Sequence, residues 1–177
     1  LARYIVVAKD AQGQVSDKTF SNFKVIGTPY TIPYAESFAA GNPSSFWGES
    51  HEGIGRWLPL AASDTYVKDA DGGMYSFTSV QGGDSGMGFS GLIDLAGAAN
   101  PVLSFWYFCT ETGSDELQVM AAADGGDFET LQDLDASSES TYRTWNQVTV
   151  PLSAYTDSRF VQVAFSNRSL SGSSLVY

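Results

Sequence analysis

Short stretches of alternating apolar and polar residues recur along the whole chain, separated by clusters of Gly, Asp, Ser and Asn. Strict alternation is typical of β-strands with one exposed face, whereas an amphipathic helix needs apolar positions three and four residues apart. No segment of useful length has that helical spacing, and clusters such as QGGDSG at residues 81–86 suit turns. The pattern therefore predicts an all-β chain. The expected strands cover residues 3–9, 20–26, 34–39, 65–69, 74–80, 103–109, 116–122, 145–152 and 159–165.

The segment LSFWYFC at residues 103–109 is apolar at nearly every position. Its odd positions are Leu103, Phe105, Tyr107 and Cys109, and its even positions are Ser104, Trp106 and Phe108. We expect a central strand of a sandwich, with one face in the core and the other covered by loops or lining a groove. Segments 116–122 and 159–165 alternate more cleanly, which predicts one buried and one partly solvated face for each.

Length and composition bound the number of cores. The chain has 177 residues and 43% hydrophobic residues, which is enough for one full core but not for two full-sized domains. Cys109 is the only cysteine, so no intrachain disulfide can form, and we expect it to be a small buried apolar residue. No run approaches the roughly 18 apolar residues that a membrane-spanning helix needs.

The net charge of −11 restricts the partners. An acidic chain is repelled by the phosphates of nucleic acids and by anionic membrane surfaces, so neither is expected to bind. Carboxylates suit hard cations such as Ca²⁺, although they also keep proteins soluble. Charge alone is therefore compatible with a calcium site without requiring one.

The first 27 residues, LARYIVVAKDAQGQVSDKTFSNFKVIG, resemble the last two strands of a fibronectin type III domain, with Leu1 three residues before Tyr4. The resemblance implies that residues 1–28 are the C-terminal hairpin of an incomplete upstream sandwich domain. The segment GTPYTIP contains two prolines that favour extended chain, so it is expected to act as the linker. Residues 29–177 would then form the second domain.

The remainder, from Tyr34 onward, resembles the jelly-roll modules called MAM-like, cleaved-adhesin and choice-of-anchor J domains. The resemblance rests on the ordered segments PYAESFAAGNPSSFW, DADGGMYSF, SGLIDLAGAANPVLSFWYF, DELQVMAAADGGDFETLQDL and TWNQVTVPLSAYTDSRFVQVAF. It implies an antiparallel jelly-roll β-sandwich from a secreted or cell-surface protein, especially of Bacteroidetes. The family's closing strand has no full counterpart in SGSSLVY at residues 171–177, which predicts a truncated strand and an open sheet edge that favours self-association.

Two groups of residues are candidates for a structural Ca²⁺. The resemblance implies a ligand at Glu36, although no second acid matches the family's closing strand. Independently, Asp69 and Asp71 in DADGG alternate as carboxylates do where a turn wraps a calcium ion. The same alternation is found in solvated turns, so both interpretations stay open.

Three ring-bearing residues are candidates for carbohydrate contacts. Trp47, His51 and Trp57 fall within one Gly- and Ser-rich stretch, and a planar ring beside polar groups can pack against the CH face of a sugar. Core packing is the competing interpretation for both tryptophans. Trp106 and the pair Tyr142 and Trp145 are alternative platforms, for which packing is favoured because of their strand positions.

Catalysis is not predicted. His51 is the only histidine and lies in a Gly-rich loop, which disfavours a Ser-His-Asp triad, and no acid has a flanking pattern that predicts a raised pKa for glycoside hydrolysis. We therefore expect a non-catalytic extracellular module for adhesion or carbohydrate binding, whose partners are a glycan or surface protein and the neighbouring domains of its own polypeptide. A purely structural spacer is the alternative, and a glycoside hydrolase domain is disfavoured.

Overall fold

The computed structural model describes residues 28–38, 47–60, 68, 74–79, 82–110, 116–134, 143–169 and 174–176. This part of the chain forms β-strands and one 3-10 turn, η2 (Ser153–Tyr155), and it contains no α-helix. The strands are β1 (Tyr30–Thr31), β2 (Gly48–Glu52), β3 (Arg56–Leu60), β4 (Met74–Ser79), β5 (Ser85–Phe89), β6 (Ile93–Asp94), β7 (Val102–Tyr107), β8 (Glu116–Ala123), β9 (Glu129–Leu134), β10 (Asn146–Pro151), β11 (Val161–Arg168) and β12 (Ser174–Val176). The all-β prediction is confirmed.

The larger sheet is built around β11. One edge of β11 pairs with β8 along its whole length, and the other edge pairs with β5 and, at Val161, with β6. Strand β9 pairs outside β8, and β2 pairs outside β5. These pairs are antiparallel, whereas β1 runs parallel to β6. A strand with neighbours on both edges has its backbone groups in the ladder on each side, which makes β11 the natural centre of the sheet.

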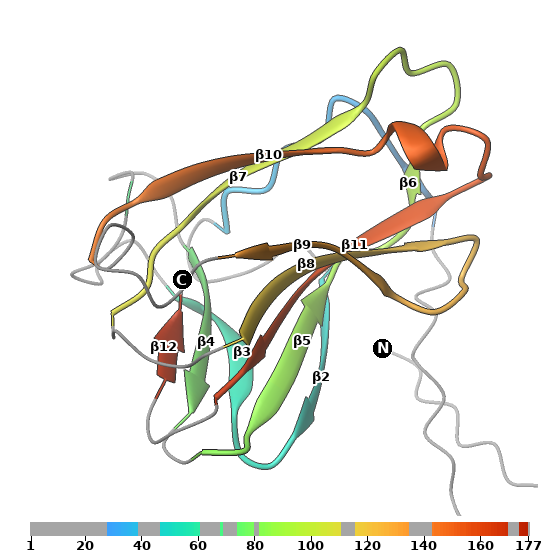
Figure 1. The fold of residues 1–177 in the computed structure, drawn as a ribbon. Coiled ribbons are helices and arrows are strands. Elements are labelled where there is room, and N and C mark those ends of the chain that lie inside the picture. Colours follow the sequence, from blue (N-terminus) through green and yellow to red (C-terminus); the bar gives the residue numbers. More distant parts are fainter. Residues whose placement is uncertain are drawn as a thin grey trace, which may run out of the picture.

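A second layer faces this sheet and consists of two pieces, β12-β4-β3 and β10-β7. An isolated bridge between Cys109 and Val176 connects them. Figure 1 shows β7 and β10 running together above β8, β9 and β11, while β3 and β4 stand beside β5 and β2. The described residues contain no helix that could cross a membrane.

The core lies between the two layers. Phe77, Val119 and Val161 have no solvent-exposed surface, and they come from β4, β8 and β11. On β8 the buried positions include Leu117, Val119 and Ala121, which is the face predicted from the alternation. On β11 the residues from Val161 to Ala164 are buried on both faces, so the partly solvated face predicted there is wrong for the first half of this strand.

On β7, the aromatic side chains alternate between the inner and the outer face of the strand. Leu103 and Phe105 point into the core, where the Phe105 ring meets Phe165 edge-on at 4.8 Å, and Tyr107 is buried. Trp106 lies on the opposite face and exposes 42% of its surface. The outer face of β7 is therefore only partly covered at this ring, and the alternative prediction that it lines a groove stays a prediction.

Strand β5 occupies part of a segment predicted as a turn. Its two glycines are required by close packing: a Cβ on Gly88 would overlap a ring carbon of Tyr75, and one on Gly86 would lie 2.8 Å from the Phe77 ring. Glycine weakens strand propensity, so the sequence pattern resembles a turn although the backbone is extended. Rings of the smaller sheet rest directly on this backbone.

Several predicted elements lie elsewhere or cannot be compared. Residues 34–38 form no strand, and the positive φ of 50° at Phe38 is incompatible with extended backbone, so the strand predicted at 34–39 is wrong over this stretch. The predicted strands at 3–9 and 20–26, and with them the fibronectin-like hairpin, lie outside the described residues. The same holds for segment 65–69 apart from Lys68. The predicted boundary between two domains therefore stays a prediction.

Replacing Gly88 should test the ring-on-backbone packing. Gly88→Ala is expected to lower the free energy of unfolding by about 2 kcal/mol, because the added methyl group overlaps the Tyr75 ring. Urea denaturation of the two proteins measures the difference. Ser85→Ala on the same strand is the control, with an expected change within about 0.5 kcal/mol. Equal stability of Gly88→Ala and the parent protein would show that the ring is not held there.

Candidate functional site

Trp57, a predicted sugar contact, lies in the core. Its side chain is 4% exposed, and its indole Nε1 donates a hydrogen bond to the carbonyl oxygen of Gly86 at 2.9 Å. The ring stacks against Tyr75 with a centroid distance of 5.2 Å and packs beside Phe77 at 5.8 Å. A ring enclosed in this way cannot stack on a sugar. The packing interpretation describes Trp57.

Trp47, the second predicted ring contact, is half-buried and immediately precedes β2, the edge strand of the larger sheet. Its ring stacks on Phe165 at 6.0 Å and lies near Phe38 and Tyr75 at 5.4 and 5.5 Å. The indole Nε1 is buried and has no hydrogen-bond partner among the described residues. Trp47 and Trp57 thus sit in one aromatic cluster, and their shared contacts are with the core.

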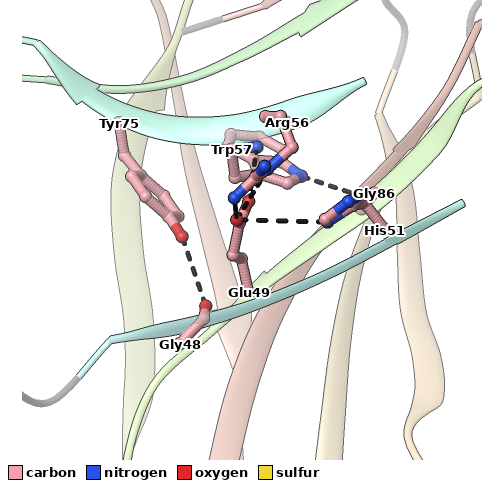
Figure 2. A network of polar contacts seen from close by, with 7 residues as sticks. All are labelled: Gly48, Glu49, His51, Arg56, Trp57, Tyr75 and Gly86. Carbon is pink, nitrogen blue, oxygen red and sulfur yellow. Dashed lines mark hydrogen bonds and ion pairs between the residues drawn. The ribbon is translucent and has the colours of Figure 1, made fainter. Parts of the chain in front are cut away.

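His51, the third predicted contact, is exposed on β2 and stands at the rim of a polar network (Figure 2). Its Nδ1 lies 4.0 Å from the Oε1 atom of Glu49. The centre of the network is the Glu49 carboxylate, which accepts hydrogen bonds from the Arg56 guanidinium and from the backbone N–H of Trp57, the latter at 3.2 Å. Because Glu49 is on β2 and its partners are on β3, this carboxylate ties the larger sheet to the smaller one.

Two members of the network have raised pKa values. The hydrogen bond from Arg56 to Glu49 and the charge of Glu49 raise the pKa of the Arg56 guanidinium. Burial, followed by the charge of Glu49, raises the pKa of the Tyr75 phenol well above its ordinary value. The Tyr75 hydroxyl donates to the carbonyl oxygen of Gly48 at 3.2 Å (Figure 2). These groups are engaged in holding the sheet edges together, which is a structural role.

Glu36, the calcium ligand implied by the family resemblance, is engaged locally. Its Oε2 accepts a hydrogen bond from the Tyr34 hydroxyl and its Oε1 accepts one from the backbone N–H of Phe38, both at 2.9 Å. Among the described residues no three acidic, histidine or cysteine side chains come together as a metal site. Asp69 and Asp71 lie outside the described residues. Calcium binding therefore stays a prediction.

The outer face of the β7-β10 pair carries an exposed ring among polar groups. We call it the Trp106 face and define it by the outward positions of the two strands. These are Val102, Ser104 and Trp106 on β7, and Gln147, Thr149 and Pro151 on β10. The register places Gln147 directly opposite Trp106 and Thr149 opposite Ser104. The Trp106 ring therefore has hydroxyl and amide side chains as its neighbours on the outer face of the two strands.

A basic residue stands over this ring. The ammonium nitrogen of Lys68 is 4.2 Å from the centroid of the Trp106 ring, which is within the range of a cation-π contact. Lys68 itself is exposed. The described part of the Trp106 face therefore combines a stacking surface, neutral hydrogen-bonding groups and one positive charge.

Such a surface has the chemistry of a sugar contact. The CH face of a pyranose packs on an aromatic ring, and its hydroxyl groups exchange hydrogen bonds with Ser, Thr and Gln side chains. The sequence names Trp106 as an alternative platform but favours packing for it. What distinguishes Trp106 in the sequence is its place in the alternation. It lies two residues from Ser104 and therefore on the same face, whereas the adjacent Phe105 lies on the inward face. Trp145, another alternative, packs against Phe108 at 5.4 Å, and Tyr142 lies outside the described residues.

Comparison with known proteins identifies the fold. The chain matches no protein-family model, and no curated protein sequence matches it. Among solved structures it is similar to a cleaved adhesin domain of Lys-gingipain from Porphyromonas gingivalis, at 20% identity and a TM-score of 0.58, over 80% of this chain and 90% of that one. The jelly-roll β-sandwich is therefore confirmed as the fold.

Two carbohydrate-binding modules share this fold. One is TmCBM61, solved with β-1,4-galactotriose, at 12% identity and a TM-score of 0.52, over 74% of this chain and 86% of that one. The other belongs to the β-sandwich superfamily and was studied for promiscuous specificity; it has 16% identity and a TM-score of 0.50, over 97% of this chain and 68% of that one. At these identities the likeness establishes architecture.

The buried phenol in the network gives a test by pH. The unfolded Tyr75 ionises near its ordinary pKa of 10.0, whereas the folded one stays protonated at higher pH, so the unfolded state binds fewer protons and stability falls above about pH 10. Tyr75→Phe removes the phenol and, with it, this contribution to the loss of stability at high pH. Urea denaturation from about pH 8 to about pH 11 should show a smaller alkaline loss of stability in the variant than in the parent protein.

At about pH 8 the same variant should be less stable by about 1 kcal/mol, because the Gly48 carbonyl loses its donor. Tyr30→Phe, which removes the hydroxyl of an exposed tyrosine, controls for the substitution itself. An alkaline loss in Tyr75→Phe as large as in the parent protein would contradict the assignment.

Proposed function

We propose that this chain is a non-catalytic extracellular module that binds carbohydrate and thereby contributes to adhesion within a larger multidomain protein. One observation carries the proposal: Trp106 is 42% exposed on a strand face whose neighbouring side chains include hydroxyl and amide groups. Large rings in this fold gain most by packing inward, as Trp47 and Trp57 do. An exposed aromatic ring beside hydrogen-bonding side chains has the chemistry that a sugar contact needs.

The shared architecture supports this choice of ligand class. The fold is that of an adhesin domain and of modules that bind carbohydrate, one of them solved with β-1,4-galactotriose. Polysaccharides are therefore the first ligands to test, with β-1,4-galactan among them. The likeness to an adhesin domain also supports the proposed membership of the MAM-like and cleaved-adhesin group and a location outside the cell. The proposal includes an upstream fibronectin-like neighbour, which the sequence of residues 1–27 supports.

The proposal of a non-catalytic role is supported by the environment of the single histidine. A general base needs a nucleophile within hydrogen-bond reach and a third group that orients it. His51 is instead exposed beside Glu49, whose carboxylate is already bound to Arg56 and Trp57. Its surroundings are those of a surface ion-pair network.

A structural spacer is the second candidate function. It is favoured by the packing of Trp47 and Trp57, the two tryptophans for which the sequence predicts a ligand-binding loop. A spacer needs a stable core and no exposed contact surface. The two candidate functions differ in their need for Trp106. A carbohydrate-binding module needs its exposed ring, whereas a spacer does not.

Substitution of Trp106 should separate the two functions. Trp106→Ala is expected to weaken binding to any neutral β-linked polysaccharide bound by the parent protein by about tenfold or more, because the stacking surface is lost. Affinity electrophoresis against a panel that includes β-1,4-galactan measures the effect. Thermal denaturation of the variant should change little, since the ring is exposed.

Leu58→Ala provides the matched control. Leu58 is a large apolar residue that is 45% exposed on β3, in the other piece of the same layer. Its truncation should leave binding unchanged. Unaltered binding by Trp106→Ala would contradict the Trp106 face as the site, and absence of binding to every glycan of a broad array would favour the spacer.

A further inference from the structure

Charge is unevenly divided between the two layers. The smaller layer consists of β3, β4, β7, β10 and β12, and none of these strands contains Asp or Glu. The strands of the larger sheet carry six acidic residues: Glu49, Glu52, Asp94, Glu116, Glu129 and Asp133. In a chain with a net charge of −11, the strands that form the Trp106 face are therefore free of carboxylates.

Lys68 gives this face a positive centre. Its ammonium lies 4.2 Å from the Trp106 ring centroid, and an ammonium carries three N–H donors. The ammonium meets the ring as a charge, and a group with three N–H donors can bind a ligand carboxylate in addition to the partners that Lys68 has in the structure. An aromatic platform with its own cation is matched by a ligand that has both an apolar face and a negative charge.

We propose that the Trp106 face recognises an acidic polysaccharide, a chain that contains uronate sugars, in which a sugar ring takes the place of the Lys68 ammonium on the Trp106 ring and pairs its carboxylate with the displaced ammonium. The inference rests on the proposed carbohydrate-binding function and names the class of sugar. The neutral groups Ser104, Gln147 and Thr149 suit the hydroxyls of the same ring or of the next one. From Val102 to Trp106 the strand extends over about 13 Å, which exceeds the length of one sugar ring.

A polysaccharide fits this face better than an acidic peptide. Peptides usually bind a sheet by pairing with the backbone of an edge strand, which needs no exposed ring on the face. Here the recognition elements are side chains on the face itself: a planar ring, two hydroxyls and an amide. A uronate presents a flat CH surface, several hydroxyls and one carboxylate in a single unit, so it uses each of these elements.

Salt dependence alone would be ambiguous. Added salt weakens the pairing of Lys68 with a carboxylate, but it also screens the repulsion between a polyanion and a chain with a net charge of −11. A comparison of two ligands that share one backbone removes this ambiguity. Polygalacturonate and its methyl-esterified form share the same sugar chain, and esterification removes the negative charge of the sugar.

The experiment measures the affinity of the full chain for both polymers by affinity electrophoresis and by titration calorimetry. The parent protein should prefer polygalacturonate by about fivefold, the upper end of what an exposed ion pair contributes. Lys68→Gln should abolish this preference while it still binds the methyl ester, and Lys68→Glu should reverse it. Trp106→Ala should lose both ligands, because the stacking surface serves each of them.

Arg159→Gln is the matched control. Arg159 also lies over an aromatic ring, that of Phe160 at 4.9 Å, but it precedes β11 in the larger sheet. Its removal changes the net charge as Lys68→Gln does and should leave the preference unchanged. Poly-glutamate is the control ligand, and it should bind much more weakly than polygalacturonate.

The outcomes distinguish a failure of the uronate assignment from a failure of the proposed carbohydrate-binding function. Binding of the methyl ester or of neutral glycans without preference for the uronate overturns this inference and leaves the proposed function intact. The uronate assignment also fails if Lys68→Gln keeps the preference, if Arg159→Gln abolishes it equally, or if poly-glutamate binds as tightly. Failure to bind any glycan overturns both.

Discussion

The contact between aromatic rings of the smaller layer and the glycine backbone of β5 sets the geometry of the sandwich. Tyr75 and Phe77 approach Gly88 and Gly86 at distances that no side chain at those positions would permit. Close approach removes apolar ring surface from water, and such burial is where most of the stabilisation of a small β-sandwich originates. Trp57 extends the same cluster and satisfies its N–H on the Gly86 carbonyl, so this indole leaves no unpaired donor there.

This packing also decides which rings remain for other purposes. The inner space is filled by rings from β3, β4 and β7, and the inward parity of β7 belongs to Leu103, Phe105 and Tyr107. Trp106 is out of phase with them and is forced outward. At the open edge, the Glu49 carboxylate caps the backbone of β3 and joins it to β2, which keeps the two layers in register beside the cluster. The outward ring, the lysine over it and the acid-free strands then define one face with its own chemistry.

Much of the fold can be predicted because a strand that alternates cleanly between apolar and polar residues buries its apolar face. The alternation predicts β7, β8, β10 and β11 to within a few residues, and it predicts the inward face of β8 correctly. The strands that the pattern misses, such as β5 and β9, have glycines or polar residues where a pattern search needs apolar ones. The site is predicted less well: RWLPL looks irregular and suggests a loop for Trp57, although it pairs as β3 with β4.

The sequence alone determined the secondary-structure class, the absence of an intrachain disulfide, the strongly negative charge and the alternation of side chains within each strand. All of these are properties of composition or of near neighbours. Which face of β7 meets the core, whether Trp57 is buried, and that Lys68 lies over Trp106 were decided by the tertiary structure. Alternation fixes only the relative phase of side chains along one strand, whereas the direction of each face depends on the sheet packed against it, and that sheet is built from residues far away in the chain.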